Sequence, residues 1–270
     1  MMEGKNKIDI QHPEAWELLV LVEDEQVSYI LYTPTVDGSL ITGEVERAED
    51  SLQALEDAIY DTGELLNEYK RTRVIVHSTH FVLLPLDTPD DDCTMLLHEA
   101  FPDDDGDVAL SPMAQNGVKI AYLMPRGLQA FLGRTFNYPT LYHHLSPLCE
   151  HFKQELCQDS QSRMLLNLRN GHMDLAVYCD GSLQCANTYP LSNVDDAVYY
   201  ALNVWRTHGL DQLNDELQIT GNHPLCAAMT TKLREFVKHV MPFAFPTAAM
   251  RLGRNAIQAP LELILLALCE

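Results

Sequence analysis

The sequence has few basic residues and no long uninterrupted apolar segment. Of its 270 residues, 18 are Lys or Arg and 39 are Asp or Glu, which gives a formal net charge of −21. The longest apolar run, at 261–269, is too short to span a bilayer and is typical of a buried helix. Contacts with nucleic acids and anionic lipids depend on clustered basic residues. We therefore expect no nucleic-acid partner and no membrane insertion.

Signals for metal binding, export and common catalytic chemistries are also missing. The seven cysteines show no C-x-x-C or other metal-ligand spacing, and an odd number of free thiols is typical of a reducing compartment. The first twenty residues contain no basic start followed by an apolar stretch, so no secretory signal is indicated. The chain lacks a nucleophile elbow, a Walker loop and a zinc-protease helix. We expect a cytoplasmic protein with no bound metal, and we assign no catalytic residue.

The acidic residues that are present lie mostly in the first part of the chain. Residues 1–110 contain 26 acidic and 6 basic residues, whereas residues 111–270 contain 13 and 12. Such a surface is either a solvated face that keeps the protein soluble or a docking face for a basic protein partner. With 46% hydrophobic residues, the chain can form one large core or two smaller ones.

The same order of expected elements occurs twice along the chain. The apolar and turn patterns predict three strands, a helix and a strand, at 17–23, 26–34, 39–46, 52–69 and 73–77. The second series lies at 163–168, 173–179, 182–189, 194–205 and 216–220. The first strands align at an offset of 146 residues. The repeated order of elements and this alignment favour two copies of one unit, although an unrelated α/β enzyme can contain the same elements by chance.

The tetrapeptide Asp-Gly-Ser-Leu occurs in both series, at 37–40 and 180–183, an offset of 143 residues. Asp-Gly tolerates positive φ, so each copy is predicted to be a hairpin turn between the second and third strands. Carried forward, the offset of 143 places Val74 on Leu217.

Two acidic stretches lie between the series, at 88–94 and 102–108. A calcium loop with Gly106 as its turn glycine would place Phe101 at the first ligand position and Pro112 where a bidentate Glu belongs. We therefore interpret both stretches as solvated loops. The remaining patterns predict helices at 93–101, 126–136 and 145–157.

The duplicated order resembles the actin-like ATPase superfamily, which has a duplicated ribonuclease H-like fold. Each copy in that superfamily opens with a phosphate-holding hairpin of the form Asp-x-Gly-x-Gly-Thr-x-Asp. The second such hairpin would lie at 167–174, where Asn167 replaces the first Asp while Gly171 and Asp174 remain. Arg169 stands where the family has glycine, and we expect its side chain to enter the phosphate space. An arginine there could still contact an anion.

The first hairpin, at 21–28, departs further from the family pattern. Leu21 replaces the catalytic Asp, and Glu23, Asp24 and Glu25 stand where phosphates would lie. Carboxylates beside a triphosphate repel it strongly in a partly desolvated cleft, so this loop argues against ATP.

The family's adenosine-binding glycine run would correspond to 220–224. One glycine, Gly221, remains there, and Pro224 has no amide donor. The hairpin at 180–183 and the closing segment at 259–270 resemble more closely an uncharacterised Bacteroidetes family of actin-like fold. That family is distantly similar to pilus-assembly and cell-division actin homologues.

This resemblance implies an α/β protein with two lobes, each with a mixed sheet of order βββαβ plus helices. The first lobe would be 1–158, with an inserted subdomain around 80–125. The second would be 159–270, with its C-terminal helix near the lobe interface. We expect a non-catalytic binding or scaffolding component with a protein partner, contacted through the acidic first lobe. The alternative is a divergent ATPase or kinase that binds ATP and Mg²⁺ through Arg169, Gly171, Asp174 and Gly221.

Overall fold

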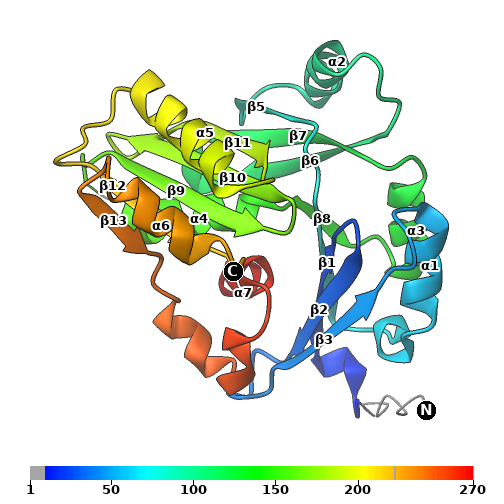
Figure 1. Ribbon diagram of the computed structural model, residues 1–270. Helices are drawn as coiled ribbons and strands as arrows, with labels where there is room; N and C mark the ends of the chain where they lie inside the picture. The colour runs from blue at the N-terminus through cyan, green and yellow to red at the C-terminus, as the bar shows by residue number, and fades with distance from the viewer. Residues whose placement is uncertain (1–9, 158, 222, 270) are drawn as a thin grey trace. The chain divides into compact units, whose positions relative to one another are not determined.

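The computed structural model describes residues 10–157, 159–221 and 223–269, and these form two compact units (Figure 1). The first unit comprises Met1–Pro112, Val118–Pro147 and Pro246–Glu270. The second comprises Met113–Gly117 and Leu148–Phe245. No helix in the described ranges combines the length and the apolar character needed to cross a membrane.

The first unit is built on a five-stranded mixed sheet of order β3-β2-β1-β4-β8. Its strands are β1 (Glu17–Val22), β2 (Gln26–Tyr32), β3 (Ile41–Glu46), β4 (Arg71–Val76) and β8 (Thr140–His143). β2 runs antiparallel to β1 and β3, whereas β4 runs parallel to β1 and β8. All six residues of β1 are buried, as expected for a central strand covered on both faces.

Helices cover both faces of this sheet (Figure 1). α1 (Leu52–Tyr60) and α3 (Leu128–Thr135) lie on one face, where Tyr60 and Phe131 meet edge to face at 5.8 Å, and α7 (Leu261–Leu268) packs against β1. Ser51 caps the N-terminus of α1, and its side chain accepts a hydrogen bond from the amide of Ala54. It is shorter than predicted, because the chain leaves the helix at Asp61 and forms a 3-10 turn instead. The 3-10 turns are η1 (Pro13–Ala15), η2 (Gly63–Leu66), η3 (Ala114–Asn116), η4 (Thr247–Arg251) and η5 (Arg254–Ile257).

A smaller three-stranded sheet of order β5-β7-β6 lies between β4 and β8 in the sequence. Its elements are β5 (Phe81–Pro85), α2 (Asp90–Ala100), β6 (Asp107–Met113) and β7 (Val118–Met124). α2 covers one face through Cys93 and Leu97, which pack against Ala121 and Leu123. The prediction of a loop over 88–94 was wrong, because α2 begins at Asp90. The acidic residues 90–92 form its first turn, where their carboxylates interact favourably with the positive end of the helix dipole.

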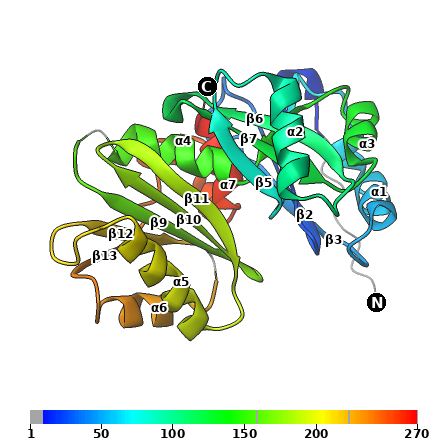
Figure 2. The same cartoon turned by 90° about the horizontal axis from the view of Figure 1, so that it is seen from above.

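The second unit contains a five-stranded sheet of order β11-β10-β9-β12-β13, with the same strand directions as the first. Its strands are β9 (Arg163–Arg169), β10 (His172–Cys179), β11 (Ser182–Pro190), β12 (Glu216–Thr220) and β13 (His239–Pro242). α5 (Val194–Thr207) and α6 (Cys226–Leu233) cover one face, and α4 (Leu145–Leu156), which belongs to this unit from Leu148 on, covers the other (Figure 2). There Tyr178 donates a hydrogen bond to the carbonyl of Cys149 at 3.0 Å.

The two Asp-Gly pairs adopt different turns. Asp180 and Gly181 have φ values of 50° and 67°, the pair of positive angles that a two-residue type I′ hairpin requires, so the prediction is confirmed there. Asp37 and Gly38 lie in the longer connection at 33–40, where the amide of Gly38 donates to the carbonyl of Arg251.

Strand pairing also corrects the alignment of the two series. Val74 pairs with Val20, and Ile219 pairs with Leu166, the residue 146 positions after Val20. The equivalent of Val74 is therefore Ile219 and not Leu217. The offset of 143 residues, taken from the two tetrapeptides, does not hold for this strand. The reason is that the connection after β2 and the connection after β10 differ in length.

The compact units do not follow a boundary between residues 158 and 159. Residues 148–157 belong with the second sheet, and the C-terminal segment from Pro246 belongs with the first. That segment contacts the first unit through backbone hydrogen bonds to Gly38 and Leu40 and through the packing of α7 against β1.

A buried arginine connects α7 to the first sheet. The Arg73 side chain is 1% exposed, and its guanidinium donates to Glu17 Oε2 at 3.0 Å, to Tyr32 Oη at 2.7 Å and to the carbonyl of Leu266 at 2.7 Å. Tyr32 in turn donates to Glu17 Oε2 at 3.1 Å. The guanidinium thus satisfies a carbonyl in the last turn of α7, where no intrahelical donor is left, and its charge complements the negative end of the helix.

Replacing Arg73 with alanine should lower the free energy of unfolding by about 3–5 kcal/mol, because Glu17 would stay buried without its cation. Urea denaturation followed by circular dichroism measures this change. Arg71→Ala is the matched control, since Arg71 is exposed on the same strand and should cost no more than about 0.5 kcal/mol. Equal losses of unfolding free energy in the two variants would contradict the stabilising role assigned to the Arg73–Glu17 pair.

Candidate functional site

The four residues predicted to hold a nucleotide all lie in the second unit, near the ends of β9, β10 and β12. β9 and β10 are joined by a two-residue turn, since Arg169 pairs with His172. Gly171 occupies that turn with φ 70°, and no atom lies within 4 Å of the position where a Cβ would be. The positive φ of the hairpin turn therefore explains why this residue is a glycine.

Asp174 on β10 is saturated by side chains of its own unit. Its Oδ1 accepts from Thr188 Oγ1 at 2.9 Å and from an Arg169 guanidinium nitrogen at 3.0 Å. Its Oδ2 accepts from Arg169 Nε at 2.7 Å and from Asn167 Nδ2 at 3.1 Å. A carboxylate offers about four lone-pair sites, and Asp174 has all four occupied while it is only 2% exposed. These four contacts use the acceptor capacity of the carboxylate.

The Arg169 side chain lies against Asp174. The two residues flank the hairpin turn on adjacent strands, and the arginine side chain is 10% exposed. Nε and one terminal nitrogen face the two carboxylate oxygens, which is the bidentate geometry that arginine favours. The sequence alone does not reveal this pair. The two residues meet only because the hairpin turn falls between Arg169 and His172.

Gly221 follows β12 and is held close to β9. Its φ is 108°, and a Cβ built there would lie 2.1 Å from the carbonyl oxygen of Leu168. The thiol of Cys226 donates to the Gly221 carbonyl, with sulfur and oxygen 3.4 Å apart. Burial raises the pKa of this thiol, which keeps it protonated and able to donate. Close backbone packing thus accounts for this glycine.

Gly221→Ala should destabilise the protein by at least about 2 kcal/mol, because the added methyl overlaps the backbone of β9 and the φ is unfavourable for alanine. Gly171→Ala is the control, since it has a positive φ but open space and should cost about 1 kcal/mol. Thermal denaturation of both variants measures the difference. A smaller loss for Gly221→Ala than for Gly171→Ala would refute the packing explanation.

Arg169→Ala should lower the free energy of unfolding by about 3 kcal/mol without any ligand, because the buried Asp174 carboxylate loses its cation. Urea denaturation is the measurement. Arg206→Ala serves as control, because Arg206 is exposed on α5 and donates to Asn203 in the same helix. A loss within about 0.5 kcal/mol for Arg169→Ala would show that the pair contributes little.

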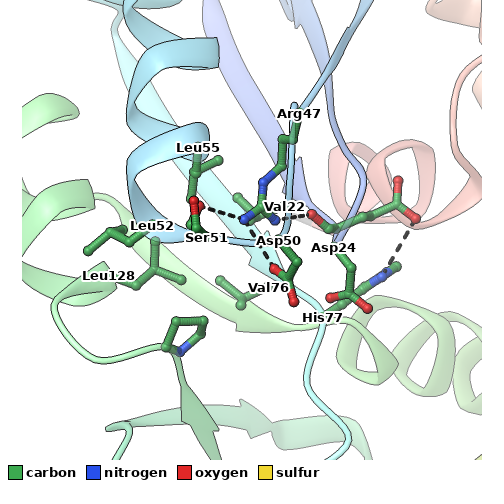
Figure 3. A pocket seen from close by; sticks show the side chains of 12 residues that line it. Val22, Asp24, Arg47, Asp50, Ser51, Leu52, Leu55, Val76, His77 and Leu128 are labelled. Carbon is green, nitrogen blue, oxygen red and sulfur yellow. Dashed lines mark hydrogen bonds and ion pairs between the residues drawn. The ribbon is translucent and has the colours of Figure 1, made fainter.

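The corresponding hairpin of the first unit lies beside a cavity of about 260 Å³ (Figure 3). The cavity lies at the carboxyl ends of the parallel strands β1 and β4, where Val22, Val76 and His77 line it. The connection from β1 to β2 forms one rim, and it is tight, since the amide of Glu23 donates to the carbonyl of Gln26 at 3.0 Å. Open α/β sheets bind ligands at this edge.

Arg47 is the central polar residue of this cavity. It donates to the carbonyl of Glu23 at 2.5 Å, to Asp50 Oδ1 at 3.2 Å and to the carbonyl of Ser51 at 2.9 Å. Its side chain is 5% exposed. Arg47 therefore joins the first hairpin to the beginning of α1. Sequence reasoning missed it, although Arg47 is the sole basic residue between positions 8 and 69.

His77 provides the remaining polar wall, with Nδ1 3.6 Å from Glu23 Oε1 and its ring 4.9 Å from that of His144. Within the described ranges, no group of three or more His, Cys, Asp and Glu side chains is placed to hold a metal ion.

The two five-stranded sheets with equivalent hairpins, each covered by helices, are those of the actin-like ATPase fold, and the expected fold class is confirmed. A Bacteroides thetaiotaomicron protein described as having an actin-like ATPase fold and unknown function is similar to this chain with a TM-score of 0.81 and 22% identity. The similarity covers 97% of this chain and 99% of that one. The chain belongs to the family DUF3822, described as a protein of unknown function, which matches residues 5–240.

Two further solved structures are similar to this chain at low identity. The PilM-PilN type IV pilus biogenesis complex contains a chain with a TM-score of 0.52 and 11% identity, covering 94% of this chain and 98% of that one. The cytoplasmic domain of EpsL from Vibrio cholerae, an inner membrane component of the type II secretion system, has a TM-score of 0.49 and 12% identity, covering 91% and 96%. Among curated protein sequences, none matches this chain.

Proposed function

We propose that this protein is a non-catalytic, cytoplasmic member of the actin-like superfamily that acts as a binding or scaffolding component. The observation that carries the proposal is the saturated Asp174 carboxylate. An ATPase of this fold needs that carboxylate to position a metal-bound water or to act as a base. Here Arg169, Asn167 and Thr188 occupy its acceptor sites.

The first hairpin supports the same conclusion through its charge. Three consecutive carboxylates, at residues 23–25, stand at the turn between β1 and β2, where the fold family places phosphates. Like charges a few ångströms apart repel strongly when they are partly desolvated. Arg47 does not offset this repulsion fully, because its guanidinium is already shared with Asp50 and two carbonyls.

A protein partner is favoured by the surface charge and by the neighbouring structures. The first 110 residues contain 26 acidic and 6 basic residues, which attracts basic proteins and repels nucleic acids. PilM, which shares the fold, is described in complex with PilN. The common strand order of the two sheets supports an origin by duplication of one unit.

Thermal denaturation in the presence of Mg-ATP or Mg-ADP tests the loss of nucleotide binding. We expect no stabilisation relative to sodium phosphate at equal ionic strength. A bound ligand at 100 times its dissociation constant would add about 2.7 kcal/mol, which is easily detected. Saturable stabilisation by Mg-ATP that Arg169→Ala or Gly221→Ala weakens would instead establish the alternative, a divergent ATPase or kinase.

A further inference from the structure

The cavity beside Arg47 has one apolar side. Leu52 and Leu55 of α1 and Leu128 of α3 form this wall, and Val22 and Val76 line the cavity from the ends of β1 and β4. Figure 3 shows the three leucines on the side of the cavity away from Asp24 and His77. This wall can accommodate a chain of methylene groups, which gain free energy when they leave water.

The opposite side carries an excess of carboxylates. Asp24 is exposed and, in the part of the chain that the structure describes, has no hydrogen-bond or ion-pair partner. Asp50 takes one hydrogen bond from Arg47 and is 66% exposed. The terminal nitrogens of the Arg47 guanidinium are engaged, and its Nε, which has no hydrogen-bond partner among the described residues, is buried. The polar groups that an entering ligand can reach are therefore mainly carboxylate oxygens, which accept hydrogen bonds.

The volume of the cavity and the charge of its lining residues indicate which ligand it can bind. Pockets for drug-sized ligands measure about 300–1,000 Å³, so a cavity of about 260 Å³ fits one long side chain better than a nucleotide. An anion would face Asp24 and Asp50. An alkylammonium group would instead place its methylenes on the leucines and its three N–H donors toward these carboxylates.

We propose that this cavity binds the side chain of a lysine presented by a partner protein. The ammonium lies between Asp24 and Asp50, and the aliphatic stem lies on Leu52, Leu55 and Leu128. A protein source is favoured over a free amine because residues 1–110 contain 26 acidic and 6 basic residues, and this excess of charge attracts a basic protein through more contacts than the cavity alone provides. The inference rests on the proposed binding function and specifies the chemistry of the partner.

Nuclear magnetic resonance titration of the full chain tests this proposal with n-butylammonium, the analogue of a lysine side chain. We expect saturable shifts of the amide signals of Asp24, Ser51 and His77. Butanoate and butanol, which have the same chain length without the positive charge, should give no saturable shifts. Saturable binding of butanoate or the lack of binding of butylammonium would overturn the proposal.

Two variants test where the ammonium group binds. Asp24→Asn should weaken binding of butylammonium about tenfold, whereas Asp57→Asn, an exposed residue of α1 outside the cavity, should leave it unchanged. Asp24 is exposed and contacts no partner among the described residues, so we expect its variant to keep the fold and give a comparable spectrum. Unchanged affinity in Asp24→Asn would overturn the assignment.

The source of the ammonium is tested with two further probes. Nα-acetyl-lysine methylamide should bind at least as tightly as butylammonium, because its backbone stays outside the cavity. Tighter binding of spermidine than of the lysine derivative would overturn the assignment to a protein side chain. Mg-ATP added to the same sample distinguishes the two proposals: its binding contradicts the proposed function, whereas the absence of amine binding contradicts only this inference.

Discussion

The first unit depends on the burial of one arginine. Arg73 lies on β4, next to the central strand β1, is 1% exposed, and has its charge compensated by Glu17 on β1. A buried guanidinium without such a partner would cost several kcal/mol, so Tyr32 of β2 and the carbonyl of Leu266 in α7 are held where they can accept its hydrogen bonds. Residues nearly 200 positions apart are thereby held in one compact unit. The position of the C-terminal segment follows from this requirement.

The two equivalent hairpins differ in how their charged side chains are paired. In the second unit, Arg169 and Asp174 neutralise each other, with Nε and Oδ2 2.7 Å apart. In the first unit, Arg47 joins the hairpin to α1 while Asp24 and Asp50 stay exposed. The second hairpin has its buried carboxylate paired with an arginine, whereas the first carries Asp24, which is exposed and has no partner among the described residues. The proposed lysine site therefore lies in the first unit.

Much of the fold could be predicted because it depends on local patterns. The run of buried apolar residues in β1 follows from the sequence, as does the order of elements in the two sheets. The turn at Asp180 and Gly181 was predictable because few residue pairs tolerate two positive φ angles. The start of α2 was not, since consecutive aspartates favour both a solvated loop and the first turn of a helix.

Composition, strand order and hairpin positions are properties of the sequence, because they follow from charge, apolar periodicity and turn chemistry over a few residues. The roles of single polar residues required the tertiary structure. Arg169 pairs with Asp174 because the turn at Gly171 brings β9 and β10 into register, and Gly221 is a glycine because the backbone of Leu168 passes close to it. Arg47 lines a cavity whose leucines come from separate helices. Such contacts join residues distant in the sequence, so their geometry exists only once the strands and helices have packed.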